Sequence, residues 1–389
     1  MKITQTRWSQ AGGWSPALSE VASPEADLVF LFGASVIWTK PELLEELHAV
    51  LPGAKFLGCS TSGEIHGTEV TDDTLVVTVV KFAHTQLRGA AVRIEGAQES
   101  RLAAKNLMAE LPRSVPSADG NGEDPLVHVF VLSDGLNVNG SELVHGLTAG
   151  LPQGVSVTGG LAGDGARFVQ THVVWEGKVA QKLVAAIGFY GRRLQVGCGS
   201  LGGWDSFGPE RVITRSQGNV LYEFDGQSAL ALYKKYLGEH AAGLPATGLL
   251  FPLSLRTKSD EMPVVRTILG IDEQAGSMIF AGDVPEGSYA RLMKANFDRL
   301  IDGASGAATT GYQAIGSNSP ELALLISCVG RKLVLKQRIE EEVEGVREVL
   351  GAGAALTGFY SYGEISPFTP GAKCELHNQT MTITTLREI

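Results

Sequence analysis

Several features are scarce or absent in this 389-residue sequence, and each absence narrows the class of protein. There is no run of 18 uninterrupted apolar residues, so we expect no membrane span. There is no run of Lys and Arg, and the net charge of −10 argues against a nucleic-acid binder, whose affinity depends on neutralising phosphates. The first residues form no apolar signal segment, which predicts a cytoplasmic protein.

Cysteine is also scarce, and its spacing excludes two kinds of chemistry. The four cysteines are far apart and form no CxxC pair, which favours reduced thiols in a cytosolic protein. The absence of Cys-x-x-Cys-His excludes covalent haem attachment, and no HExxH or paired Cys/His spacing indicates zinc. The cysteines are Cys59, Cys198, Cys328 and Cys374.

The residues that are abundant indicate a packed protein of more than one domain. Hydrophobic residues make up 44% and charged residues 19%, so burial can offset the loss of chain entropy on folding. The length favours two or three domains. The 48 glycines follow no Gly-X-Y period, so they mark turns and strand ends and do not indicate collagen.

One glycine-rich segment is repeated along the chain. Residues 57–65 (LGCSTSGEI) and 357–365 (TGFYSYGEI) share both glycines, the Glu and the Ile, which is four identities in nine positions. Residues 158–165 (TGGLAGDG) form a weaker copy. The first glycines lie at 58, 159 and 358, which indicates duplicated structural units.

The residues that precede each copy repeat as well. Short apolar runs at 28–32, 127–132 and 322–326 are each followed by a stretch with apolar residues three and four apart. This order predicts strand-helix-strand units with parallel neighbouring strands. Alternating patterns at 75–80, 183–190 and 380–386 predict further antiparallel strands, so the expected fold class is mixed α/β.

Two segments are expected to link these units. Residues 114–124 are rich in Pro, Ser, Gly and Asp, which predicts an insertion loop. Residues 199–209 are rich in glycine and precede a new helix-like start. We therefore place a domain boundary here, between residues 1–209 and residues 210–389.

The quoted segments carry a family resemblance. Together with Tyr222-Glu223-Phe224-Asp225-Gly226 and Leu376-His377-Asn378-Gln379-Thr380, they resemble the FIST proteins, bacterial sensory proteins with an N-terminal and a C-terminal FIST part. The resemblance extends from about Leu28 to Leu386. It implies two FIST-type domains, residues 1–209 with two repeat units and residues 210–389.

The resemblance also implies a function. FIST proteins are thought to bind small ligands, with amino acids suggested, and this chain would be a stand-alone sensor that signals through a partner such as a histidine kinase or a cyclic-di-GMP enzyme. Some relatives of the NosP type are similar to haem-dependent nitric-oxide sensors, which makes haem binding an alternative.

The glycine turns are the first candidate ligand site. A strand that ends in glycine lets a ligand approach the backbone, and free N–H groups there can bind an anion. Ser60 and Thr61 add hydroxyls, while Glu64 and Glu364 lie at equivalent places and could receive an ammonium group. The alternative is that the glycines serve only tight packing between repeats. The flanking residues match neither a Walker A loop nor a dinucleotide-binding turn.

A second group of polar residues gathers near the C-terminus. Pro367, Pro370 and Gly371 predict a loop that folds back and brings these residues together. Aromatic walls and polar anchors suit a small polar ligand, whereas the alternative is a buried His-Asn pair that fixes the loop. The candidates are Tyr360, Ser361, Tyr362, Glu364, His377 and Asn378.

Two narrower alternatives name single residues. His240 follows a helix-like stretch and is the candidate axial ligand for haem. Cys59 or Ser60, at the end of a predicted strand, would be the nucleophile of a cysteine- or serine-dependent hydrolase. No Gly-x-Ser-x-Gly motif is present and nothing selects a base, so we expect no enzyme.

Overall fold

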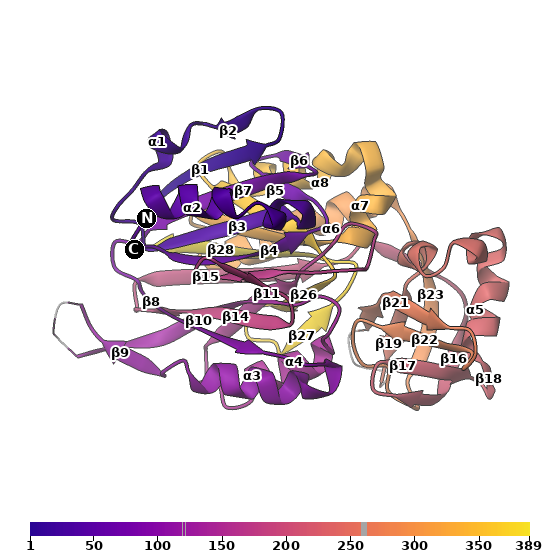
Figure 1. Ribbon diagram of the computed structural model, residues 1–389. Coiled ribbons are helices and arrows are strands. Elements are labelled where there is room, and N and C mark those ends of the chain that lie inside the picture. Colours follow the sequence, from indigo (N-terminus) through magenta and orange to yellow (C-terminus); the bar gives the residue numbers. More distant parts are fainter. Residues whose placement is uncertain (119, 121, 258–262) are drawn as a thin grey trace.

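The computed structural model describes residues 1–118, 120, 122–257 and 263–389. The chain forms a large body and a smaller lobe, which lies at the right of Figure 1. The two chain ends lie together on the body, because the Met1 ammonium is 3.6 Å from a carboxylate oxygen of Glu388. The predicted mixed α/β class is confirmed.

The body consists of three units, each with two parallel strands joined through a helix, as the sequence predicts. Each helix presents its apolar residues, spaced three and four apart, to the sheet. Unit one contains β3 (Leu28–Ala34), α2 (Pro41–Val50) and β4 (Lys55–Thr61); unit two contains β10 (Glu123–Ser133), α4 (Gly140–Thr148) and β11 (Ser156–Leu161); unit three contains β24 (Leu322–Cys328), α8 (Ile339–Leu350) and β25 (Ala355–Ser361).

A third strand returns antiparallel beside the first strand of each unit. These strands are β7 (Thr74–Lys81), β14 (Leu183–Tyr190) and β28 (Met381–Glu388). Just before each of them, one residue takes a left-handed backbone conformation: φ is 55° at Asp73, 53° at Lys182 and 65° at Gln379. The repeat therefore extends to single backbone angles.

The units exchange strands in a closed cycle. After its glycine turn, unit one places β5 (Glu64–His66) on β25 of unit three. Unit three places β26 (Gly363–Pro367) on β11 of unit two. Unit two places β12 (Val173–Trp175) on β4 of unit one. Because each unit completes the sheet of another, the three depend on one another for their hydrogen bonds.

The remaining elements of the body extend these sheets or cover them. The strands are β1 (Lys2–Ser9), β2 (Gly13–Ser15), β6 (Glu69–Thr71), β8 (Gln86–Arg93), β9 (Ser114–Pro116), β13 (Lys178–Ala180), β15 (Leu194–Leu201) and β27 (Cys374–His377), and the helices are α1 (Leu18–Val21), α3 (Ser100–Ala109), α6 (Phe297–Ala314) and α7 (Val329–Leu335).

In the described residues, the core of the body has one central cluster, an outer cluster on each of the three sheets, and a small cluster toward the lobe. Phe30, Phe130 and Phe359, one from each unit, are fully buried in the central cluster. The rings of Phe30 and Phe130 meet edge to face at 5.4 Å. In the outer clusters, α2, the pair α3 and α4, and the pair α6 and α8 cover the other faces of the three sheets. Aromatic packing at the centre thus joins the three units.

The lobe is a separate sheet with its own apolar cluster and the helix α5 (Ala229–Leu237). The expected boundary after residue 209 falls within its strand β16, and β15, which precedes the lobe, pairs with β28 of unit three. The lobe strands are β16 (Trp204–Gln217), β17 (Val220–Phe224), β18 (Gln227–Ser228), β19 (Leu253–Arg256), β20 (Val264–Arg266), β21 (Ile268–Asp272), β22 (Ser277–Phe280) and β23 (Tyr289–Ala295).

The segment 114–124, predicted to be a loop, is in part a β-hairpin. Its start, β9, pairs antiparallel with residues 123–125 of β10. Residues 119 and 121 lie outside the described residues. Turn-forming composition led the sequence prediction to miss this short pairing, because a three-residue strand leaves almost no periodic signal.

Candidate functional site

The three glycine turns meet at the centre of the body, where backbone hydrogen bonds join them in a ring. The Ser62 N–H donates to the Tyr360 carbonyl at 2.8 Å, the Tyr362 N–H to Leu161 at 3.2 Å, and the Gly163 N–H to Ser60 at 2.8 Å. Each unit donates to one neighbour and accepts from the other. We call residues 60–62, 161–163 and 360–362 the central ring.

Close backbone contact explains the first glycine of each turn. A Cβ at Gly58 would lie 2.3 Å from the Leu31 carbonyl oxygen, and one at Gly358 would lie 1.8 Å from that of Leu325. A Cβ at Gly159 would lie 1.9 Å from the Val131 carbonyl oxygen. These glycines therefore serve tight packing between parallel strands.

The two predicted glutamates occupy equivalent positions beside the ring and are fully buried. The Ser361 hydroxyl donates to Glu364 Oε1 at 2.6 Å, and the Thr380 N–H and hydroxyl donate to Oε2 at 3.2 and 3.1 Å. Glu64 accepts the matching set from Thr61 and Thr74. Each carboxyl thus ties its turn to the returning strand.

Burial changes the protonation of both carboxyl groups. It raises the pKa of Glu64 to about 7 and that of Glu364 to about 8, although the hydrogen bonds they accept act in the opposite direction. A carboxyl in an apolar core resists ionisation because its charge loses the stabilisation of water. At mildly acidic pH both groups are therefore neutral.

The hydroxyls and tyrosines of the ring are buried with their polar atoms paired. Ser60 Oγ accepts the His172 N–H at 2.8 Å. The Tyr360 hydroxyl donates to Glu342 at 2.7 Å, and the Tyr362 hydroxyl donates to the Gly165 carbonyl at 3.1 Å. Ligand contact with the predicted ring residues stays a prediction, and it would require the ring to open.

His377 ends β27, and Asn378 follows it, between the third glycine turn and the lobe. The His377 imidazole is 2.7 Å from the Ser366 carbonyl through Nε2, its ring lies 4.1 Å from that of Phe368, and burial lowers its pKa to about 4. The Asn378 amide donates to the Tyr362 carbonyl at 3.2 Å and accepts the Thr267 N–H of the lobe at 3.3 Å. Asn378 thus connects the central ring to the lobe.

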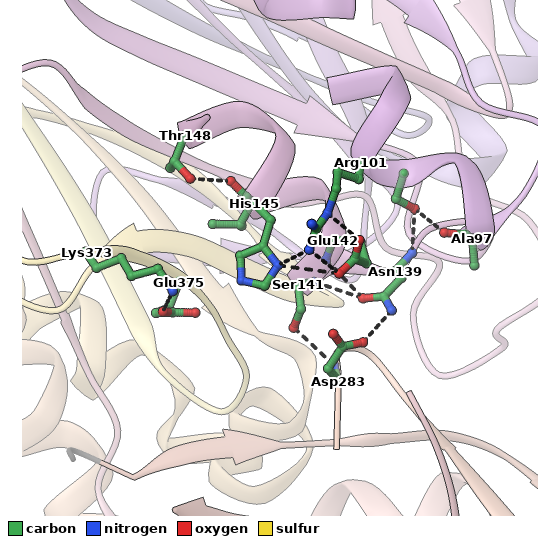
Figure 2. Close-up of polar contacts among 12 residues, drawn as sticks. Ala97, Arg101, Asn139, Ser141, Glu142, His145, Thr148, Asp283, Lys373 and Glu375 are labelled. Carbon is green, nitrogen blue, oxygen red and sulfur yellow. Dashed lines mark hydrogen bonds and ion pairs between the residues drawn. The ribbon is translucent and has the colours of Figure 1, made fainter. Parts of the chain in front are cut away.

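A cleft of about 540 Å³ opens between the body and the lobe. It lies between α4 of unit two, the hairpin β26–β27 of unit three and the lobe segments that follow β19 and β22. This volume is in the range of small-molecule sites. Figure 2 shows part of it, with α4 above and Asp283 of the lobe below. The polar residues that line it are Ser141, His145, Arg256, Thr257, Arg266, Asp283, Ser288, Thr369, Lys373 and Glu375.

Arg266 forms one wall of the cleft and joins the lobe to units two and three. Its guanidinium donates to the carbonyls of Asp283 at 3.0 Å and Leu376 at 2.9 Å, and to Ser141 Oγ at 3.2 Å. Burial lowers its pKa to about 10, against the opposing effect of the Glu375 and Asp283 charges. It remains a cation at neutral pH.

The side chains around Arg266 are held in place by their own partners. Asn139, the N-cap of α4, accepts the backbone N–H groups of Ser141 and Glu142 and donates to the Asp283 carboxylate at 2.6 Å. Figure 2 shows this network and the separate Lys373–Glu375 pair, 2.8 Å apart. Sequence reasoning missed the cleft because its residues come from three distant segments; the only local signal was Asn139 as an N-cap.

The residues of the two narrower alternatives lie elsewhere. His240 is exposed on a 3-10 turn (Gly238–Gly243), with its ring 5.3 Å from Phe251. An exposed ring against one aromatic side chain does not provide the enclosed apolar slot of a haem site, so these residues do not fit a haem. Cys59 is fully buried and burial raises its pKa well above its usual value, which disfavours the reactive thiolate.

Within the described ranges, none of the helices combines the length and the apolar character that a membrane crossing requires. In the same part of the chain, three or more His, Cys, Asp or Glu side chains nowhere gather closely enough to hold a metal ion.

Comparison with protein families identifies both halves of the chain. Residues 27–227 match the FIST N domain and residues 229–367 match the FIST C domain. This protein belongs to the FIST family. FIST domains are sensory domains for small ligands, which supports a sensory role for the chain.

Other comparisons add little to the family assignment. No curated protein matches this FIST chain. Among solved structures, it is similar to the crystal structure of cyanuric acid hydrolase from A. caulinodans, with 8% identity, 99% of each chain covered and a TM-score of 0.38. A likeness at this level carries no conclusion about fold or function.

Proposed function

We propose that this protein is a sensor that binds its small ligand in the cleft between the body and the lobe. The observation that carries the proposal is the cleft itself, with a volume of about 540 Å³ and polar side chains converging from α4, the β26–β27 hairpin and the lobe. Sites for small ligands combine such a volume with a few placed polar groups.

The third unit connects the cleft to the predicted site residues. Phe368 lines the cleft and packs on His377, and Asn378 links Tyr362 of the ring to Thr267 of the lobe. Ligand-induced movement of the lobe would therefore reach Tyr360, Ser361, Tyr362 and Glu364. Ser60, Thr61 and Glu64 would respond through the ring.

The output of the sensor would be a change in the surface offered to another protein. The family resemblance favours a histidine kinase or a cyclic-di-GMP enzyme as that partner. A rearrangement between lobe and body suits such signalling, because a ligand that binds one arrangement better shifts the population toward it.

Thermal unfolding in the presence of amino acids and other small metabolites tests the proposal. A ligand that binds the folded protein raises the unfolding temperature in a saturable way. Ala372 lies exposed on the cleft, so Ala372→Trp should fill the cleft and abolish the rise without altering the fold. Leu102→Trp, on an exposed part of α3, is the matched control. The assignment would be refuted if no compound raised the unfolding temperature, or if the increase were the same in Ala372→Trp.

A further inference from the structure

The two buried arginines of the described chain differ in one respect. Arg331 in α7 is fully buried and pairs with Glu342, also fully buried, at 2.7 Å. Arg266 is 4% exposed, and no carboxylate among the described residues lies within ion-pair distance of it. Asp283 is held by Asn139, and Glu375 pairs with Lys373. A buried cation without a bonded counter-charge is costly, so a ligand that supplies one would be stabilised here.

The guanidinium of Arg266 also has donor capacity left. An arginine carries five N–H groups. In the described residues, four are used, toward Asp283, Leu376, Val265 and Ser141. The fifth N–H belongs to Nη2, the atom that lies 3.2 Å from Ser141 Oγ.

Ser141 supplies a second donor at the same place. Its Oγ accepts both the Arg266 Nη2–H and, at 3.1 Å, the Asp283 N–H. A hydroxyl has two acceptor lone pairs and one proton. With both lone pairs engaged, Ser141 can act toward a ligand only as a donor, and it lines the cleft.

Ser288 provides an independent observation. It is 2% exposed, lines the same cleft, and its Oγ has no hydrogen-bond partner among the described residues. Buried polar atoms are rarely left unpaired, so an unpartnered hydroxyl on a cleft wall indicates a group that arrives from outside.

We propose that Arg266, Ser141 and Ser288 bind an oxyanion of the ligand, either a carboxylate or a phosphate monoester. The proposal rests on the function assigned to the cleft and names the chemical class of its ligand. The N–H groups of one cation and the hydroxyls of two serines that line the same cleft match the oxygens of both groups. The cleft is far larger than one such group, so the remainder of the ligand lies toward Lys373 and Phe368.

Titration of the full chain with paired probes tests the proposal. Succinate and glycerol 3-phosphate represent the two oxyanions, and succinamide and glycerol are their neutral counterparts, all at one ionic strength set with sodium chloride. We expect saturable binding of at least one charged probe and none of its neutral counterpart. Binding of succinate alone would identify a carboxylate site, and binding of glycerol 3-phosphate alone a phosphate site.

Variants then connect the binding to the named residues. Ser141→Ala should weaken it about tenfold or more, since a hydrogen bond to a charged group is lost, while Ser141→Thr keeps the hydroxyl and should retain most of the affinity. Ser288→Ala should weaken it without affecting other contacts, because its Oγ has no described partner. Ser19→Ala, on the exposed surface of α1 in the body, is the control.

The outcomes separate this inference from the proposed function. A neutral ligand that binds and is displaced by Ala372→Trp would leave the sensor function standing and overturn the oxyanion site. Unchanged affinity in both Ser141→Ala and Ser288→Ala would also overturn it. Absence of binding by every charged probe and every metabolite would overturn both.

Discussion

The buried carboxyl of Glu364 should make the stability of the protein depend on pH. The group is fully buried and accepts hydrogen bonds from Ser361 and Thr380, and burial raises its pKa from 4.5 to about 8. In the unfolded chain the ordinary value of 4.5 applies. Between these two values the folded protein holds a proton that the unfolded chain has lost.

The sign and the size of the effect follow from that difference. Because the folded state binds the extra proton, the contribution to stability is fully present below pH 4.5 and is lost as the pH rises toward 8. Each pH unit lowers the free energy of unfolding by about 1.4 kcal/mol, which amounts to about 5 kcal/mol over the whole interval. Glu64, with its pKa raised to about 7, adds a second decrease in the free energy of unfolding, which is complete at a lower pH than that of Glu364.

Glu364→Gln removes the titration and keeps the shape of the neutral acid. The amide can donate to Ser361 and accept from Thr380. We therefore expect the variant to be similar in stability to the parent protein near pH 5 and several kcal/mol more stable than it near pH 8. Urea unfolding at pH 5, 6, 7 and 8 measures this difference.

A matched control and a clear negative result complete the experiment. Glu344→Gln changes an exposed glutamate on α8 and should not alter the pH profile. If the stability of Glu364→Gln relative to the parent protein is the same at pH 5 and pH 8, Glu364 is ionised in the folded state and the reasoning is wrong.

Three further predictions concern the ring, the buried ion pair and the thiols. Gly358→Ala should destabilise the protein by about 1–3 kcal/mol or prevent folding, because its Cβ would lie 1.8 Å from the Leu325 carbonyl oxygen; Gly353→Ala, where nothing lies within 4 Å, should be nearly neutral in the same thermal assay. Arg331→Met should cost about 3–5 kcal/mol in urea unfolding because it leaves the Glu342 charge buried and unpaired, and adding Glu342→Gln should recover much of the loss; an unchanged midpoint in the single variant would contradict this. A thiol reagent should label no cysteine of the native protein and all four after unfolding, since all are buried; rapid native labelling would show that the core opens.

The sequence by itself determined the repeated architecture of this protein. The glycine at 58, 159 and 358 is required wherever two parallel strands approach too closely for a Cβ, and the helices follow from apolar residues three and four apart. The glycine positions and the apolar spacing depend only on local structure, so they are retained although the rest of each copy differs. The aligned repeats also identify Glu64 and Glu364 as equivalent positions.

Tertiary structure alone decided which residues meet. Strand exchange among the units turns Ser60, Tyr360 and Leu161, which lie about 100 to 300 positions apart, into neighbours in the ring and buries the polar side chains expected to face a ligand. The cleft arises only when the lobe, which carries Arg266 and Ser288, docks against Ser141 of unit two and the β26–β27 hairpin of unit three. No local periodicity encodes that docking, since it depends on long-range packing, and the site is therefore a property of the assembled fold.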